Sequence, residues 1–123
     1  MSQWRVVIAN YLPPRINEWD GRRWAVRARI KKACYEMIAS YVLMADVPQA
    51  TSRRRVSMEL TIGPLGRGMD PDAFLKATLD GLVACGALVD DSARWCVLGT
   101  PTVERGPEPR TVIVLEDVEE VTK

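Results

Sequence analysis

Five aspartates and one lysine lie close together in the sequence between residues 70 and 91. Asp70 and Asp72 flank a single residue, and Asp72, Lys76 and Asp80 follow one another at i,i+4 spacing, which predicts a charged helix stripe or ordinary ion pairs. Asp90 and Asp91 come after a short apolar stretch. Carboxylate oxygens are the protein ligands that Mg²⁺ and Mn²⁺ prefer, and an ammonium group stabilises negative charge on a phosphate. Because aspartates also begin helices, the segment has two interpretations, a helix cap and a metal site.

The cap interpretation explains the first two aspartates. Asp70 directly precedes Pro71, and aspartate at a helix cap followed by proline at the first helical position is a favoured combination. Asp72 falls in the first turn, where the helix dipole favours a negative charge by about 0.3–1 kcal/mol. The fixed φ of Pro71 also holds both carboxylates at a rigid corner. The cap and the metal site are therefore compatible.

The chain contains no histidine, and this limits the chemistry. Ser-His-Asp and Cys-His nucleophiles are excluded, so catalysis would rest on carboxylates, lysine, arginine or a metal. Phosphodiester hydrolysis needs an activated water and neutralisation of charge, which one or two divalent cations about 3.5–4 Å apart supply without histidine. If the chain returns to the sheet after its second helix, Asp91 comes back towards Asp70 and Asp72, beside Lys76.

The elements that must position these residues follow from apolar periodicity. Alternation of Val56, Met58, Leu60 and Ile62 predicts a half-buried strand. Helical spacing predicts helices over residues 22–44 and 71–85, the second with a core stripe from Phe74 to Leu82 and a left-handed cap at Gly86. The predicted apolar side of the first helix consists of Trp24, Ile30, Cys34, Met37, Ile38 and Tyr41. Further strands are expected at residues 3–10, 95–100 and 111–118. The prediction is an α/β (α+β) fold with a small mixed sheet of about four strands and two main helices, in the order β-α-β-α-β-β.

Composition and charge set wider bounds. A chain of 123 residues with 47% hydrophobic and 27% charged residues predicts one globular domain over residues 1–123, with a frayed tail from about residue 117. No apolar run reaches membrane-spanning length, and Cys34, Cys85 and Cys96 are expected to be reduced thiols in a cytoplasmic protein. Residues 1–68 carry a net charge of +7 and residues 69–123 a net charge of −6. The basic half can attract a polyanion, or the two halves can simply pair with each other.

The stretch MDPDAFLKATLDGLVACGALVDDS resembles the RusA family of Holliday junction resolvases. Its aspartates, lysine and final Asp-Asp pair fall at the family's motif positions, and the upstream LPPRIN and RRRVSMELTI are also similar. The resemblance implies a homodimeric, often phage-encoded endonuclease that nicks four-way DNA junctions in recombination and repair with Mg²⁺ or Mn²⁺. It assigns metal binding to Asp70, Asp72 and Asp91, with Asp90 as a further candidate, and catalysis to these residues with Lys76.

The sequence departs from the family pattern at Ala73, where the family usually has asparagine, and at Arg23, where many relatives have histidine. Two alternatives therefore stay open: a weakened RusA-like DNA-binding protein, and a globular domain without nucleic-acid function. If branched DNA is the partner, the expected phosphate contacts come from the basic half. They are Arg67, beside the acidic corner, with Arg53, Arg54, Arg55, Arg27 and Lys31. Alternatively, these cations are a solvated helix face and a charged sheet edge.

Overall fold

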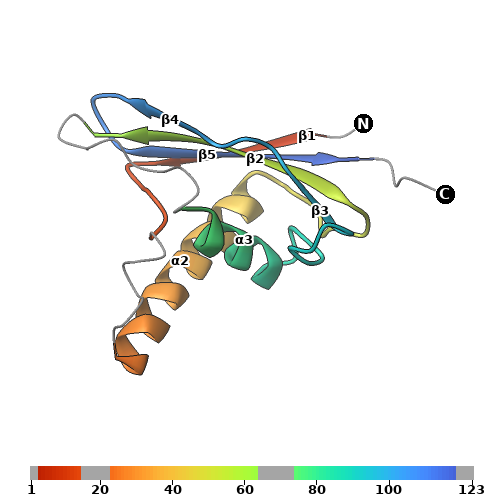
Figure 1. Ribbon diagram of the computed structural model, residues 1–123, viewed down its shortest axis with the longest axis horizontal. Helices are drawn as coiled ribbons and strands as arrows, with labels where there is room; N and C mark the ends of the chain where they lie inside the picture. Colours follow the sequence, from red (N-terminus) through yellow and green to blue (C-terminus); the bar gives the residue numbers. More distant parts are fainter. Residues whose placement is uncertain (1–2, 15–22, 64–73, 119–123) are drawn as a thin grey trace.

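The computed structural model describes residues 3–14, 23–63 and 74–118. These residues form one mixed sheet with two helices on one of its faces (Figure 1). The elements in chain order are β1 (Gln3–Ala9), α2 (Trp24–Met44), β2 (Arg54–Ile62), α3 (Leu75–Ala84), β3 (Cys96–Leu98), β4 (Thr102–Arg105) and β5 (Arg110–Asp117). The predicted α/β class, with two main helices on a small mixed sheet, is confirmed.

The sheet has a strand that the sequence prediction omits. Its order is β1-β5-β2-β3, and β4 also pairs with β2. Strands β3 and β4 run parallel to successive parts of β2 and so share one edge, with β3 beside Arg54–Val56 and β4 beside Glu59–Ile62. Gly99 lies at the break between them, where its amide donates to Val56 O and a Cβ would come within 2.5 Å of Ser57 Oγ. A side chain at residue 99 would therefore require the Ser57 hydroxyl to move.

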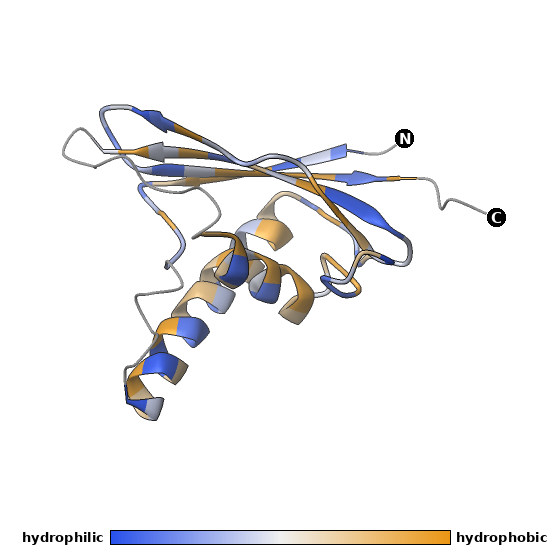
Figure 2. Ribbon diagram, in the orientation of Figure 1, coloured by the Kyte–Doolittle hydropathy of each residue, from blue (hydrophilic) through white to orange (hydrophobic). Residues whose placement is uncertain are grey.

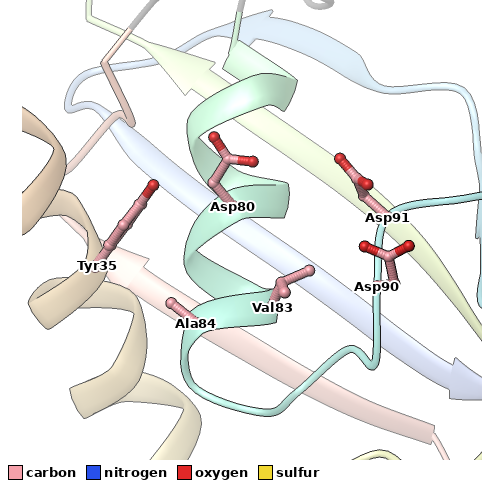
Figure 3. Close-up of a pocket in the computed structure, with 6 residues that line it drawn as sticks. All are labelled: Tyr35, Asp80, Val83, Ala84, Asp90 and Asp91. Carbon is pink, nitrogen blue, oxygen red and sulfur yellow. The ribbon is translucent and has the colours of Figure 1, made fainter.

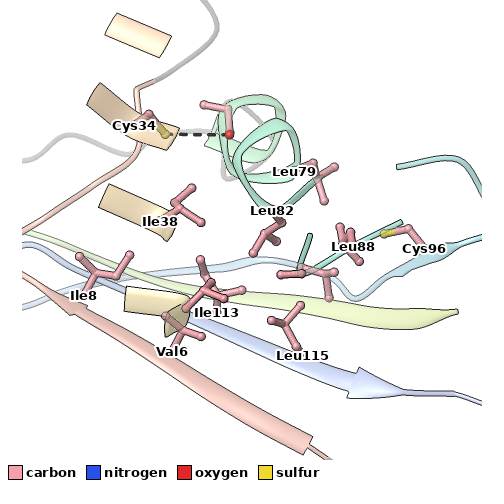
Figure 4. Close-up of a cluster of buried hydrophobic side chains, with 14 residues drawn as sticks. Val6, Ile8, Cys34, Ile38, Leu79, Leu82, Leu88, Cys96, Ile113 and Leu115 are labelled. Atoms are coloured by element: carbon pink, nitrogen blue, oxygen red, sulfur yellow. Dashed lines mark hydrogen bonds between the residues drawn. The ribbon is translucent and has the colours of Figure 1, made fainter. Parts of the chain in front are cut away.

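The core lies between the sheet and the helices. Val6 and Ile8 of β1 and Ile113 and Leu115 of β5 are almost fully buried, and they pack in one cluster with residues of both helices (Figure 4). The inward alternation predicted for β2 is confirmed, because Val56, Met58, Leu60 and Ile62 are all buried. The predicted core stripe of α3 is also confirmed at Phe74, Thr78, Leu79 and Leu82. The start of this helix at Pro71 lies outside the described residues.

Helix α2 covers the sheet with its second half only. Its buried residues are Cys34, Ile38 and Val42, whereas its first turns project away from the sheet (Figure 1). Trp24 was grouped with the apolar side of this helix, but its side chain is 77% exposed because no other described element reaches it. Figure 2 shows hydrophilic bands along this projecting part.

Two further expectations concern the chain's ends and thiols. Asp117 is the last residue of β5 and pairs with Arg54, whereas residues 119–123 of the tail that is predicted to fray lie outside the described residues. All three cysteines are free, and Cys34 and Cys96 are buried. Gly86 has a φ of 84°, which confirms the left-handed cap predicted after α3. No helix in the described part of the chain is long and apolar enough to cross a membrane.

Candidate functional site

Three aspartates border one hollow in the surface, on the side of α3 that is turned away from the hydrophobic core. The hollow has a volume of about 380 Å³ and is lined by Tyr35, Asp80, Val83, Ala84, Asp90 and Asp91 (Figure 3). Asp80 comes from α3, Tyr35 from the neighbouring α2, and the Asp90–Asp91 pair from the loop after α3. This loop was expected to return along the helix.

The direction of that return agrees with the expectation. After α3 the chain turns at Gly86 and runs back along the helix, so Asp91 lies farther towards the start of α3 than Asp90, across the hollow from Asp80 (Figure 3). Buried Ala87 and Leu88 anchor the beginning of the loop, and their amides donate to Leu82 O at 2.9 and 3.2 Å. Asp70 and Asp72 lie outside the described residues. Their contact with Asp91 therefore stays a prediction.

Lys76 lies on the same side of α3 as the hollow. Its Nζ is 3.3 Å from Asp80 Oδ1, one helical turn away, and its side chain is about half exposed. The pairing predicted from the i,i+4 spacing is therefore present. The pair leaves ammonium hydrogens free for a second partner, because an ammonium group has three donors. Lys76 can therefore contact a ligand without leaving Asp80.

Negative charge at the site acts on two nearby groups. Burial raises the pKa of the Tyr35 phenol, Asp80 and the Cys34 thiol raise it further, and Lys76 acts in the opposite direction. Tyr35 therefore stays protonated at neutral pH and can donate a hydrogen bond. Burial likewise raises the pKa of the Cys96 thiol, with Asp91 adding to the rise and Arg53 opposing it. Arg53 and Asp91 thus act in opposite directions on the pKa of the same thiol.

The oxygen donors suit a hard divalent cation, but the described aspartates do not form a complete site. Among residues 3–14, 23–63 and 74–118, no three Asp, Glu, Cys or His side chains are grouped closely enough to hold a metal ion. Asp80 entered the sequence prediction only as part of a charged helix stripe, yet it borders the hollow with Asp90 and Asp91. Tyr35 was missed, since only the packing of α2 against α3 brings it there.

The residues that were predicted to contact phosphates lie on different parts of the molecule. Arg67 lies outside the described residues. Arg27 is exposed on the projecting part of α2, and Lys31 lies one turn farther along. Arg55 is exposed, and strand alternation turns it to the sheet face opposite the helices. Arg53 is half-buried and Arg54 is buried, so these two residues and Arg55 do not form one basic surface.

Arg54 is wrong as a phosphate contact. Its side chain is 2% exposed, and its Nε lies 2.9 Å from Asp117 Oδ1. Its Nη1 donates to Pro48 O and Ala87 O, each at 2.9 Å, and its guanidinium carbon lies 4.6 Å from the centre of the Trp4 ring. A guanidinium with these partners cannot reach DNA without unfolding the surrounding loops.

Comparison with known proteins does not assign the chain to a family. No protein-family model matches the chain, and no curated protein shows significant similarity to it.

Proposed function

We propose that this protein is a metal-dependent endodeoxyribonuclease of the RusA type, which nicks four-way DNA junctions during recombination and repair. The observation that carries the proposal is the return of the chain after α3, which brings Asp90 and Asp91 to the hollow that Asp80 borders, while Asp80 itself pairs with Lys76. A helix cap accounts for Asp70 and Asp72 alone. It gives no reason for a second acidic pair and a lysine on the same side of the helix.

The proposed ligands for Mg²⁺ or Mn²⁺ are Asp70, Asp72 and Asp91, with Asp90 as a further candidate. When bound, the cation supplies neutralisation of phosphate charge and a lower pKa for a coordinated water. An ammonium group has three donors, so Lys76 can stabilise charge that develops on the phosphate or the leaving oxygen while it contacts Asp80. Protonated Tyr35 can donate to a phosphate oxygen at the other side of the hollow.

The DNA partner is supported by the distribution of exposed cations. The first turns of α2 carry Arg27 and Arg29, both exposed, and no acidic residue occurs in this helix before Glu36. Exposed Trp24 lies at the start of the same helix. Cations attract the phosphate backbone, and an aromatic ring can stack on a base that is unpaired at a branch point. A homodimer would supply two such sites with the two-fold symmetry of a four-way junction.

Junction cleavage tests this proposal. Wild-type protein with Mg²⁺ is expected to nick a synthetic four-way junction on two opposed strands, and to leave a linear duplex of the same arms intact. Asp72→Asn is expected to bind the junction without nicking it, because the amide is a poorer ligand for a hard cation. Failure of the wild type to nick any of several junctions with either metal would contradict the proposal.

The second candidate is a junction-binding protein with weakened catalysis, and Ala73 favours it. An asparagine amide can donate and accept hydrogen bonds near a metal or phosphate, and a methyl group cannot. This candidate predicts that the wild type binds junctions but nicks them poorly, and that Ala73→Asn increases nicking. Equal, efficient nicking by both proteins would eliminate it.

A further inference from the structure

Arg54 connects the sheet to both ends of one loop. We call residues 87–95 the acidic loop, because they include Asp90 and Asp91. At the start of this loop, Arg54 Nη1 donates to Ala87 O at 2.9 Å. At its end, the Arg54 backbone amide donates to Trp95 O at 3.1 Å. One residue of β2 therefore contacts both ends of the acidic loop, through its side chain at Ala87 and through its backbone at Trp95.

The contacts use the geometry of a guanidinium group. The single hydrogen on Nε faces the Asp117 carboxylate, and the two hydrogens on Nη1 serve two carbonyl oxygens, of Pro48 and Ala87. Lysine has one nitrogen at the end of its side chain and cannot occupy the Nε and Nη1 positions together. An apolar side chain would fill the volume but would leave both carbonyls without this donor.

A role in packing alone does not require these contacts. A buried charge is stabilising only if its partners compensate for lost hydration, and apolar side chains of similar volume often serve stability equally well. Here one of the compensating partners, Ala87 O, belongs to the loop that carries the aspartates. The Asp117 carboxylate, 2.9 Å from Arg54 Nε, balances the charge. The arrangement therefore favours a fixed loop position over packing as the reason for an arginine.

We propose that Arg54 is a positioning residue for Asp90 and Asp91, which it holds beside Asp80 without itself touching a ligand. This inference rests on the proposed function, since it assigns Arg54 to the same acidic site. This role differs from the phosphate contact that the sequence analysis predicted for Arg54. In the described part of the chain, residues 88–94 make no backbone hydrogen bond to β2, so Arg54 bonds to the acidic loop at Ala87 and Trp95, on either side of them.

Amide hydrogen exchange of the full-length protein tests the positioning directly. In Arg54→Lys, exchange of the acidic loop is expected to rise by about tenfold or more relative to β2, since a charge-assisted hydrogen bond is lost locally. Arg55→Lys is the matched control, because the same change falls on the opposite, exposed face and should leave both segments unchanged. Asp117→Asn keeps both carbonyl contacts, so it too should leave the acidic loop unchanged.

If amide exchange of the acidic loop in Arg54→Lys is unchanged, or if it rises no more than exchange of β2, the positioning role is overturned. So would faster exchange of the acidic loop in Asp117→Asn, a variant that remains informative if Arg54→Lys does not fold.

A Mn²⁺ titration separates this inference from the proposed function. Melting curves at increasing Mn²⁺ should show stabilisation beginning at a several-fold higher Mn²⁺ concentration in Arg54→Lys than in Arg55→Lys, with the same further rise for each tenfold increase in Mn²⁺. If Mn²⁺ does not stabilise the wild type, the proposed metal site is wrong, whereas the exchange result still decides whether Arg54 positions the loop. If Mn²⁺ stabilises all variants at equal concentrations, Arg54 does not act on the metal site.

Discussion

Lys76 and Asp80 form an ion pair across one turn of α3, with Lys76 Nζ 3.3 Å from Asp80 Oδ1. A pair of this kind on a helix surface contributes about 0.3–0.5 kcal/mol to stability. In the proposed enzyme the pair matters for catalysis, because Asp80 borders the same hollow as Asp90 and Asp91. Two variants distinguish the effect of the lysine from the effect of the ion pair, because Asp80→Asn removes the ion pair and keeps the ammonium group.

Lys76→Ala is expected to slow junction nicking by about 10²–10³-fold, the range for removal of one group that stabilises transition-state charge. Its free energy of unfolding should change by less than about 0.5 kcal/mol. Asp80→Asn should retain far more activity than Lys76→Ala. Single-turnover nicking rates and urea denaturation measure the two effects. Similar rates for the two variants would mean that the pair, and not the lysine, is what matters.

Gly86→Ala tests the turn that sends the chain back along α3. Gly86 has a φ of 84°, and an added Cβ would lie 3.2 Å from Gln49 Nε2. Alanine in this left-handed conformation is expected to lower the free energy of unfolding by about 1–2 kcal/mol. Gly63→Ala is the control, because a Cβ there meets only Pro109 side-chain atoms at 3.8 Å. Equal urea denaturation midpoints for the two variants would contradict the role of the turn.

The buried thiols predict how stability depends on pH. Burial raises the pKa of the Cys34 thiol above its ordinary value of 9.0, Tyr11 partly opposes this through a hydrogen bond, and Asp80 adds to it. Because the folded protein holds this proton more tightly than the unfolded chain, the contribution is complete below pH 9.0 and is lost as pH rises above it. Cys96 acts in the same direction.

Under reducing conditions, the free energy of unfolding should therefore fall as the pH increases above about 9. Cys34 is on α2 and donates weakly to Ala77 O at 3.9 Å (Figure 4). Cys34→Ala should lower stability at pH 7 and make the decline at high pH shallower. Urea denaturation at several pH values measures both. A decline that is equally steep in Cys34→Ala would assign it to other groups.

The projecting start of α2 predicts a salt-dependent contact with DNA. Arg27→Gln is expected to reduce the slope of log K against log salt by about 0.9 if this arginine contacts one phosphate. Arg55→Gln, on the sheet face opposite the helices, should leave the slope unchanged. Fluorescence anisotropy with a labelled junction measures both. An unchanged slope in Arg27→Gln with a reduced slope in Arg55→Gln would place the DNA on the other face of the sheet. No salt-sensitive affinity at all would favour a domain without nucleic-acid function.

Local patterns in the sequence predicted most of the fold. Alternation identified β2, and helical spacing identified α2 and α3, because each pattern repeats over several residues on a buried face. Strand β4 was missed because it has four residues, of which only Val103 is strongly apolar, and lies between Pro101 and Gly106. A strand that short is recognised only through its pairing with β2.

Long-range packing accounts for what the sequence did not predict. The alternation of β2 continues back to Arg54, but a cation was not expected inside, since its compensating partners come from β1, β5 and two loops. Trp24 fits the helical stripe, yet α2 extends beyond the sheet. In the acidic site, the spacing predicted the Lys76–Asp80 pair and the return of Asp91, whereas Tyr35 reaches the hollow only through the packing of α2 on α3.

The nicking rate of a synthetic four-way junction, with Mg²⁺, by wild type and Asp91→Asn tests the central claim most directly. The account predicts that the wild type nicks the junction and that Asp91→Asn is slower by at least about a hundredfold, because loss of a metal ligand removes several kcal/mol of charge stabilisation. Junction affinity measured without metal should be similar for the two proteins. Wild-type protein that does not nick, or Asp91→Asn that nicks at the wild-type rate, would contradict the account.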